Sequence, residues 1–399
     1  MKKVLFVTYG SGHVRMVVPV AQALAESGLA EVQVLALTTA AQVARAAGLD
    51  VLQLRDFVTP DDAAALDRGA KLMQAMDGPI ADPAETRAYL GLCYEELERE
   101  VGPEEAARRY RRDGRQAFLP QAVLRRIISK VAPALVVATN SPRAERASIM
   151  AARELGVPSI CIVDLFCLDE TWIWDRAYAD RVCVLNDGVK RFLIDAGRDP
   201  AQVAVTGNPA FDALADPGNA AAGERLRAAR GWGARRVLLW PTQVEPAFHP
   251  FNGQPGNPEL PRLALREVVA WVAAQNDVVL CVRPRAGEAP PGLPDDPRFT
   301  VAGQDIALAH LLHAVDLVVT LNSTVGLEGH LAGKRLVQVL GSVFDAAMPL
   351  ADYGIADEAV HLGGIGSALE RCLALPRAAG ARQAGHAALR VLDVIRSFL

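Results

Sequence analysis

The stretch from Ala314 to Ser342, AVDLVVTLNSTVGLEGHLAGKRLVQVLGS, determines how this chain is expected to fold. Its run Leu317 to Leu321 is apolar and rich in β-branched residues, which suits a strand buried on both faces of a parallel sheet. Asn322-Ser323-Thr324 then supplies helix N-cap residues, and Gly333 supplies a left-handed residue where a short helix would end. A second apolar run, Leu336 to Leu340, follows. The stretch therefore predicts strand, tight turn, short helix and strand.

The turn of this unit has the features of a phosphate site. A helix N-terminus at the carboxyl end of a parallel strand presents unpaired backbone N–H groups and a partial positive charge. Ser323 and Thr324 add hydroxyl donors there. Glu328 lies four residues after Thr324, outside capping-box spacing, which suits it to accept hydrogen bonds from a diol such as a ribose. The plainer alternative stays open: Ser323 only caps the helix and Glu328 only complements its dipole.

The segment NSTVGLEGHLAGKRLVQV closely resembles the nucleotide-sugar-binding segment of bacterial glycosyltransferases of the GT-B type. It is most similar to the capsule-polysaccharide and Kdo-transferase-like branch, in which an S/T-x-x-x-E-A-L-x-x-G-K pattern recurs. The resemblance implies an α/β fold with two Rossmann-like domains facing each other across a cleft. It also implies that the turn Asn322-Ser323-Thr324 meets the donor phosphates and that Glu328 meets the ribose.

The start of the chain predicts a Rossmann-like opening. A strand at Lys3 to Thr8 leads into the turn Tyr9-Gly10-Ser11-Gly12-His13, although the full G-x-G-x-x-G spacing is not met. The turn resembles the glycine loop and histidine of other GT-B enzymes, including the lipid-linked N-acetylglucosamine transferase of peptidoglycan synthesis. This resemblance implies that His13 is the catalytic base and that Gly10, Ser11 and Gly12 approach donor or acceptor. The alternative is a histidine that caps a helix or contacts phosphate, because related families use an Asp or Glu base.

Carboxylates in the first half provide a second candidate base. Asp164 follows the predicted strand Ser159 to Val163 at its carboxyl end, where α/β sheets place ligand groups. Asp169 and Glu170 lie in the loop that follows. Trp172 and Trp174 in the same loop could stack on a sugar ring or pack the domain.

Two further strand ends are expected to face the donor. The strand Arg236 to Trp240 ends in Pro241-Thr242-Gln243, where the resembling family places a donor-facing loop. The strand Val278 to Val282 ends in Arg283-Pro284-Arg285. A guanidinium group suits bidentate phosphate recognition, so Arg283 or Arg285 is expected to bind the donor phosphate. The family has a histidine where this chain has Arg285, so a histidine role is not expected there, and simple surface charge is the alternative.

The domain organisation follows from these motifs. Residues 1–212 form a Rossmann-like acceptor domain with a helical insertion at about 56–126, and 220–377 form the nucleotide-sugar domain. The segment VTGNPAFD, 205–212, resembles the interdomain turn of these enzymes and of UDP-sugar 2-epimerases. The run 213–223, with Pro217 and Gly218, is interpreted as a poorly structured boundary. Residues 378–399 form a terminal helix, which the resemblance implies crosses back onto the first domain.

Composition limits the class of protein. The 42 Lys and Arg against 46 Asp and Glu leave a net charge of −4, which disfavours nucleic-acid binding. Six cysteines without a C-x-x-C pair predict buried free thiols in a reducing cytosol. No apolar run approaches the ~20 residues of a membrane-spanning helix, so a cytoplasmic protein is expected. The basic run Arg108 to Arg115 has two interpretations. It contacts an anionic partner, which would be either the inner face of the cell membrane or an anionic acceptor, or it is a solvated face balanced by nearby glutamates.

The motifs together predict a metal-independent glycosyltransferase without a cofactor. Its donor would be a UDP-, GDP- or CMP-sugar, and its acceptor a carbohydrate or lipid-linked hydroxyl in bacterial surface polysaccharide or glycolipid synthesis. No D-x-D motif stands at a convincing strand end, so fixed cations and dipoles are expected to stabilise the leaving phosphate. Two alternatives remain: a UDP-sugar 2-epimerase, which needs several cleft carboxylates that the sequence does not reveal, and a non-catalytic nucleotide-sugar binder.

Overall fold

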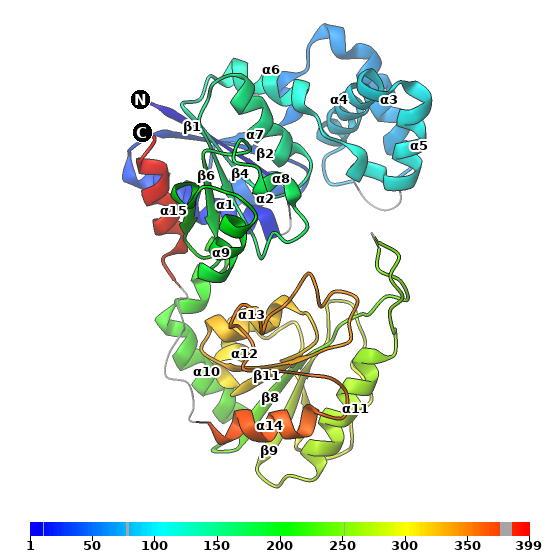
Figure 1. Ribbon diagram of the computed structural model, residues 1–399, viewed down its shortest axis with the longest axis vertical. Coiled ribbons are helices and arrows are strands. Elements are labelled where there is room, and N and C mark those ends of the chain that lie inside the picture. The colour runs from blue at the N-terminus through cyan, green and yellow to red at the C-terminus, as the bar shows by residue number, and fades with distance from the viewer. Residues whose placement is uncertain (11, 77–79, 251, 376–384) are drawn as a thin grey trace. The chain divides into compact units, whose positions relative to one another are not determined.

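The structure is a computed structural model that describes residues 1–10, 12–76, 80–250, 252–375 and 385–399. The chain divides into two compact units (Figure 1). Unit 1 comprises Met1–Ala210 with His386–Leu399, and unit 2 comprises Phe211–Gly385. Each unit is built on a sheet of parallel strands with helices on both faces, so the α/β class with two Rossmann-like domains is confirmed.

Unit 1 contains a seven-stranded sheet in the order β3-β2-β1-β4-β5-β6-β7. Its central strands are apolar runs buried on both faces, as a parallel sheet covered by helices requires. The strands are β1 Lys3–Thr8, β2 Glu31–Ala36, β3 Val51–Leu52, β4 Leu135–Thr139, β5 Ser159–Ile162, β6 Arg181–Val184 and β7 Val203–Val205.

Helices cover both faces of this sheet. One face forms a core with α1, α2 and the terminal helix α15, which returns to unit 1 from the end of unit 2 (Figure 1). On the other face, α7 contacts β1, β4 and β5 and packs against α6. The bounds are α1 Gly12–Ser27, α2 Ala40–Ala46, α6 Gln121–Val131, α7 Ala144–Glu154, α8 Thr171–Trp174, α9 Asp187–Asp195 and α15 Ala387–Arg396.

The expected helical insertion consists of α3 Ala63–Gln74, α4 Pro83–Val101 and α5 Pro103–Asp113, followed by α6. Helices α3 and α4 pack at very close range, because a Cβ built on Gly91 would lie 2.1 Å from the carbonyl oxygen of Ala65. On α5, Glu105 pairs with both Arg108 and Arg109. Part of the basic run is therefore neutralised on its own helix, as the solvated-face alternative predicted.

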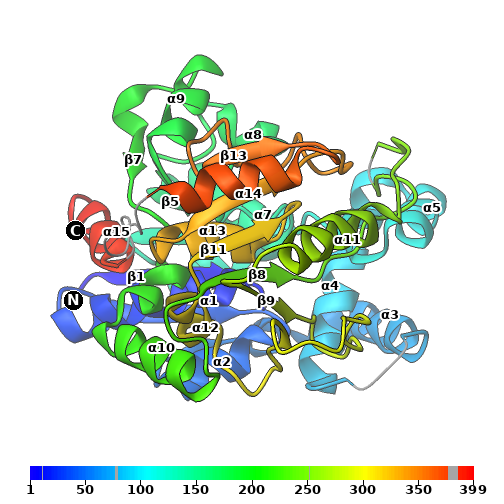
Figure 2. The same cartoon turned by 90° about the horizontal axis from the view of Figure 1, so that it is seen from below.

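Unit 2 contains a six-stranded sheet in the order β10-β9-β8-β11-β12-β13. Helices α11 and α14 lie side by side and share one core with the sheet (Figure 2). The strands are β8 Arg236–Pro241, β9 Val278–Arg283, β10 Phe299–Val301, β11 Leu317–Thr320, β12 Arg335–Val339 and β13 Glu358–Val360. The helices are α10 Pro217–Ala229, α11 Leu260–Ala273, α12 Leu308–Ala314, α13 Thr324–Leu331 and α14 Ile365–Ala374.

The interpretation of 213–223 as poorly structured is wrong. A 3-10 helix spans Pro209–Ala215, and α10 begins directly after it. Pro217 and Gly218 occupy the first turn of α10, and Asp216 caps that helix by accepting a hydrogen bond from the Gly218 amide at 2.7 Å. Proline and glycine here mark a helix start, where proline's missing N–H costs nothing.

The six cysteines are all buried, none of them in a disulfide, which agrees with the expected free thiols. Among the helices of the described residues, none combines the length and apolarity that crossing a membrane needs.

Candidate functional site

Each sheet reverses its strand order at one place, between β1 and β4 in unit 1 and between β8 and β11 in unit 2. Connections from two such neighbouring strands leave toward opposite faces of the sheet, and the carboxyl ends of the strands then form the usual ligand crevice of open α/β sheets. The turn that leads to His13 follows β1, Thr242 follows β8 and Ser323 follows β11. Each unit therefore has sequence-predicted residues at its own switch point.

The glycine turn after β1 is held from two sides. The Tyr9 amide donates a 2.6 Å hydrogen bond to Oε1 of Glu145, at the start of α7. A Cβ built on Gly10 would lie 2.0 Å from Thr39 Oγ1, so this position has no room for a side chain. A Cβ on Gly12 would meet nothing within 4 Å, and Ser11 lies outside the described residues. Close packing against Thr39 therefore explains why residue 10 is a glycine, but packing does not explain the glycine at position 12.

His13 lies in the first turn of α1 beside two charged groups. Burial lowers the pKa of His13, the Asp164 carboxylate opposes this, and the Arg143 guanidinium adds to it. Its Nδ1 atom is buried and has no hydrogen-bond partner within the described residues. The imidazole is therefore kept neutral near neutral pH, with one ring nitrogen unused. Both properties suit a general base.

Asp164, at the carboxyl end of β5, belongs to a polar cluster with Asn140 and Glu170. Nδ2 of Asn140 donates to Asp164 Oδ1 at 2.9 Å and to Glu170 Oε1 at 3.1 Å. Burial raises the pKa of Glu170, and the neighbouring Asp164 raises it further. Asn208, from the segment that resembles the interdomain turn, donates to the Asp164 carbonyl oxygen at 2.8 Å. The side-chain amide of Asn140 thus joins two of the candidate carboxylates, those of Asp164 and Glu170. The third candidate, Asp169, is exposed.

The two tryptophans of the following loop have different environments. Nε1 of Trp174 donates to the carbonyl oxygen of Cys167 at 3.1 Å, and its ring meets Phe192 edge-on. Trp174 therefore packs the unit. Trp172 instead stacks with the Arg146 guanidinium, 4.5 Å from the ring centroid, and lines a pocket.

In unit 2, Ser323 caps α13. Its Oγ accepts a hydrogen bond from the Val325 amide at 3.2 Å, and the adjacent Thr324 side chain is exposed. The loop after β8 supports this turn, because Gln243 Oε1 accepts the Asn322 amide at 2.8 Å. The two loops that flank the switch point are thus bonded to each other.

The Asn322 side chain continues this network away from the turn. Its Nδ2 donates to Ser342 Oγ at 2.7 Å, and the Ser342 hydroxyl donates to Glu245 Oε2 at 2.7 Å. Oε1 of Glu245 accepts the Val343 amide at 2.8 Å. The buried Glu245 therefore joins the loops that follow β8, β11 and β12.

Thr242 and Arg285 form a turn with Glu288. The Thr242 hydroxyl donates to Glu288 Oε2 at 2.6 Å and accepts the Arg285 amide at 3.0 Å. Thr242 is buried, so its hydroxyl already serves the turn after β9. The Arg285 side chain is exposed.

Arg283 is largely occupied by protein groups. One terminal nitrogen donates to the carbonyl oxygens of Gly303 at 3.1 Å and Ile306 at 2.9 Å. Burial lowers the pKa of Arg283, and the Glu328 carboxylate is among the groups that raise it. The structure thus brings Arg283 into the neighbourhood of Glu328, but as a residue that fixes the loop before α12.

Sequence reasoning assigned no role to several residues of these two clusters. Each comes shortly after a strand or in the first turn of the next helix. This position at a strand end was the feature of the sequence that could have identified them as site residues. They are Asn140, Glu145, Glu245, Glu288 and Ser342. Within the described part of the chain, no group of three or more His, Cys, Asp or Glu side chains is placed to hold a metal ion.

No protein-family model matches the chain, and comparison with curated proteins gave no match. Solved structures of similar fold include the UDP-GlcNAc 2-epimerase from Methanocaldococcus jannaschii, with 10% identity, a TM-score of 0.59 and coverage of 99% of each chain. The UDP-GlcNAc 2-epimerase from Neisseria meningitidis, solved with bound UDP-GlcNAc, has 12% identity and a TM-score of 0.54 and covers 99% of this chain and 100% of that chain. CalG4, the calicheamicin glycosyltransferase, has 18% identity and a TM-score of 0.55, covering 100% and 98%. At these identities the likeness establishes the fold, which this chain shares with glycosyltransferases and with UDP-GlcNAc 2-epimerases alike.

Proposed function

We propose that this chain is a nucleotide-sugar-dependent glycosyltransferase that needs no metal ion. The observation that carries the proposal is His13, which lies beside Asp164 at the switch point of unit 1 with its buried Nδ1 unpaired in the described structure. A neutral imidazole can take the proton of an acceptor hydroxyl, and a neighbouring carboxylate stabilises the imidazolium that forms. The acceptor would be a carbohydrate or lipid-linked hydroxyl of bacterial surface polysaccharide or glycolipid synthesis.

Unit 2 would bind the donor. The capped N-terminus of α13 and the exposed Thr324 hydroxyl offer donors for a phosphate, and the exposed guanidinium of Arg285 offers a charge. Glu328 would accept from the ribose. The fold neighbours support a nucleotide sugar, because one of them was solved with UDP-GlcNAc.

The transfer of the sugar requires no cofactor. The acceptor O–H bond gives its proton to His13, and the acceptor oxygen forms a bond to the anomeric carbon of the donor. The bond between that carbon and the phosphate oxygen breaks, and its electron pair stays on the phosphate. Fixed dipoles and cations around the leaving phosphate would lower the activation barrier of the transfer. They are already directed at the phosphate oxygen on which negative charge develops.

The test is nucleotide release from UDP-, GDP- and CMP-sugars in the presence of acceptor mixtures, with nucleotide binding measured by calorimetry. His13→Gln and Asp164→Asn should reduce turnover by about 10²-fold or more, as loss of a general base does, and leave nucleotide affinity unchanged. His310→Gln and Asp195→Asn are the matched controls. Full turnover in both site variants would reject this base and with it the proposal.

One observation favours a second candidate, a UDP-sugar 2-epimerase. The sequence offered Asp164 and Glu170 only as candidate bases, and the structure brings both of them to the same Asn140 amide. Burial raises the pKa of Glu170, and the neighbouring Asp164 carboxylate raises it further, which suits Glu170 to hold or release a proton. Inversion at a carbon next to the anomeric centre requires breaking and remaking a C–H bond, for which such a pair is suited.

Incubation with UDP-GlcNAc in D₂O without acceptor separates the two candidates. An epimerase gives the 2-epimer with deuterium at carbon 2, which Glu170→Gln should abolish. A glycosyltransferase leaves carbon 2 protonated and releases UDP only slowly until an acceptor is added. Binding of the nucleotide sugar with neither reaction would indicate the non-catalytic binder.

A further inference from the structure

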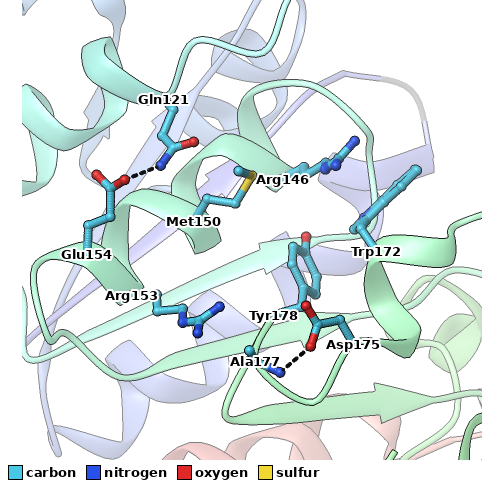
Figure 3. Close-up of a pocket in the computed structure, with 9 residues that line it drawn as sticks. All are labelled: Gln121, Arg146, Met150, Arg153, Glu154, Trp172, Asp175, Ala177 and Tyr178. Atoms are coloured by element: carbon cyan, nitrogen blue, oxygen red, sulfur yellow. Dashed lines mark hydrogen bonds between the residues drawn. The ribbon is translucent and has the colours of Figure 1, made fainter. Parts of the chain in front are cut away.

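A pocket of about 410 Å³ lies in unit 1 between α7, α8 and the segment that leads from α8 to β6 (Figure 3). Its volume is within the range of small-molecule sites. Met150 and the ring of Tyr178 contribute apolar surface, and Arg146 and Trp172 contribute a stacked cation and indole. A second cavity of about 280 Å³ shares Arg153, Ala177 and Tyr178 with it, so the two cavities are neighbours.

Arg146, which lines this pocket, stacks on Trp172 but has no hydrogen-bonding partner for its side chain within the described residues. The Arg146 guanidinium makes no hydrogen bond or ion pair with any residue that the structure describes, and its Nε is buried and unsatisfied. Nε1 of Trp172 and the hydroxyl of Tyr178 are buried and lie close to each other, but neither meets a partner in hydrogen-bond geometry within the described residues. Tyr178 is only 5% exposed, and Figure 3 shows its hydroxyl end directed between Arg146 and Trp172. Leaving buried polar groups unpaired costs stability, and such groups often await a ligand.

The two acidic side chains around the pocket, by contrast, already accept hydrogen bonds from the protein. Glu154 accepts from Gln121 at 2.6 Å and pairs with Arg125 at 3.2 Å. Oδ1 of Asp175 accepts the Ala177 amide at 2.9 Å (Figure 3). Of the charged lining residues, Arg146, Arg153 and Asp175 form no ion pair within the described residues, whereas Glu154 is paired with Arg125, so unpaired positive charge exceeds unpaired negative charge by one. This balance selects a ligand that is rich in acceptors and negatively charged.

We propose that this pocket is a binding site for a monosaccharide-sized organic anion that carries a carboxylate or a phosphate group. The anionic group meets the Arg146 guanidinium, and the ring of the ligand lies over Met150 and Tyr178. Small shifts of the Trp172 and Tyr178 side chains bring their unpaired donors to the ligand. The site is separate from the residues assigned to sugar transfer, and its existence does not depend on that assignment.

Calorimetry on the full chain tests the proposal with four probes: glucose 6-phosphate, glucuronate, glucose and inorganic phosphate. At least one of the two charged sugars should bind about tenfold or more tightly than both glucose and inorganic phosphate. Arg146→Gln should weaken that binding by about tenfold or more, as loss of a charge-assisted hydrogen bond does. Arg191→Gln, the same change on the exposed surface of α9, should leave it unaltered.

Tyr178→Phe keeps the test valid if the arginine variant fails to fold. Removing an unpaired buried hydroxyl should leave the melting temperature of the ligand-free protein unchanged or higher, while the affinity for the charged sugar falls severalfold. No binding of either charged sugar, equal binding of glucose or of inorganic phosphate, or unchanged affinity in the Tyr178 variant would each overturn the proposal.

Discussion

The buried carboxyl group of Glu145 should make unit 1 less stable as the pH rises. Its Oε1 accepts the amide of Tyr9 at 2.6 Å, but Oε2 is buried without a partner among the described residues. The Ser141 hydroxyl lies close to this carboxyl group without meeting it in hydrogen-bond geometry. Burial raises the pKa of Glu145 from 4.5 to about 7. The glycine turn before His13 is thus anchored to a carboxyl group that titrates near neutral pH.

The sign and size of the effect follow from proton linkage. Between about pH 4.5 and 7 the folded protein holds the Glu145 proton, which the unfolded chain releases. Stability is therefore highest below this window and falls as the pH rises through it. A pKa difference of about 2.5 corresponds to about 3 kcal/mol at 1.36 kcal/mol per pKa unit. Glu145→Gln keeps an oxygen for the Tyr9 amide but cannot ionise, so it removes this penalty.

The assay compares the free energy of unfolding of Glu145→Gln and wild type in urea at pH 5 and pH 8. The variant should be up to about 3 kcal/mol more stable than wild type at pH 8, and nearly equal at pH 5. Burial also raises the pKa of Glu85 to about 7, but this contribution is the same in both proteins and cancels. Glu224→Gln, an exposed control, should show no difference at either pH. A variant that differs from wild type equally at the two pH values would refute the reasoning.

Three further predictions concern packing and binding. Gly91→Ala should destabilise unit 1 by about 1–3 kcal/mol in urea denaturation, because the added Cβ would lie 2.1 Å from a backbone oxygen of α3. Gly10→Ala should cost a similar ~1–3 kcal/mol, and a second change, Thr39→Ala, should recover most of it by removing the hydroxyl that the new Cβ meets. Glu328→Gln should weaken nucleotide binding in calorimetry by roughly 1–3 kcal/mol, whereas Glu224→Gln should not.

The sequence predicted the sheets well because their strands are apolar runs ended by polar or glycine-containing turns. The strand expected at Lys3 to Thr8 is β1, and the run Leu317 to Leu321 became β11 at Leu317–Thr320. The expected turn after that strand is present, with Ser323 as the N-cap of α13 and Gly333 in the left-handed region at φ 77°. Periodicity and cap chemistry are local, so local sequence was sufficient for these elements.

The sites were harder to predict because their contacts join distant parts of the chain. Asn140 and Glu170 are separated by 30 residues and Tyr9 and Glu145 by 136, and neither pair is marked by spacing. Proline and glycine were also misleading in the first turn of α10, because Pro217 and Gly218 mark the start of a helix there and not a break. The local sequence around Glu145 likewise could not reveal that its side chain is fully buried.

The hydrogen bonds of unit 2 also change which arginine is the better candidate for the donor phosphate. Arg283 is the last residue of β9 and Arg285 follows it, and the sequence could not choose between them. Arg283 donates to two carbonyl oxygens of the loop before α12, so binding a phosphate would require it to exchange those bonds and release that loop. Arg285 has its backbone fixed by Thr242 and its side chain exposed, so it can pair with a phosphate without giving up a protein contact. An arginine whose backbone is fixed but whose side chain makes no protein contact in the described residues gives up the fewest interactions when it binds a ligand. This favours Arg285 as the residue that binds the donor phosphate and Arg283 as the residue that supports the loop before α12.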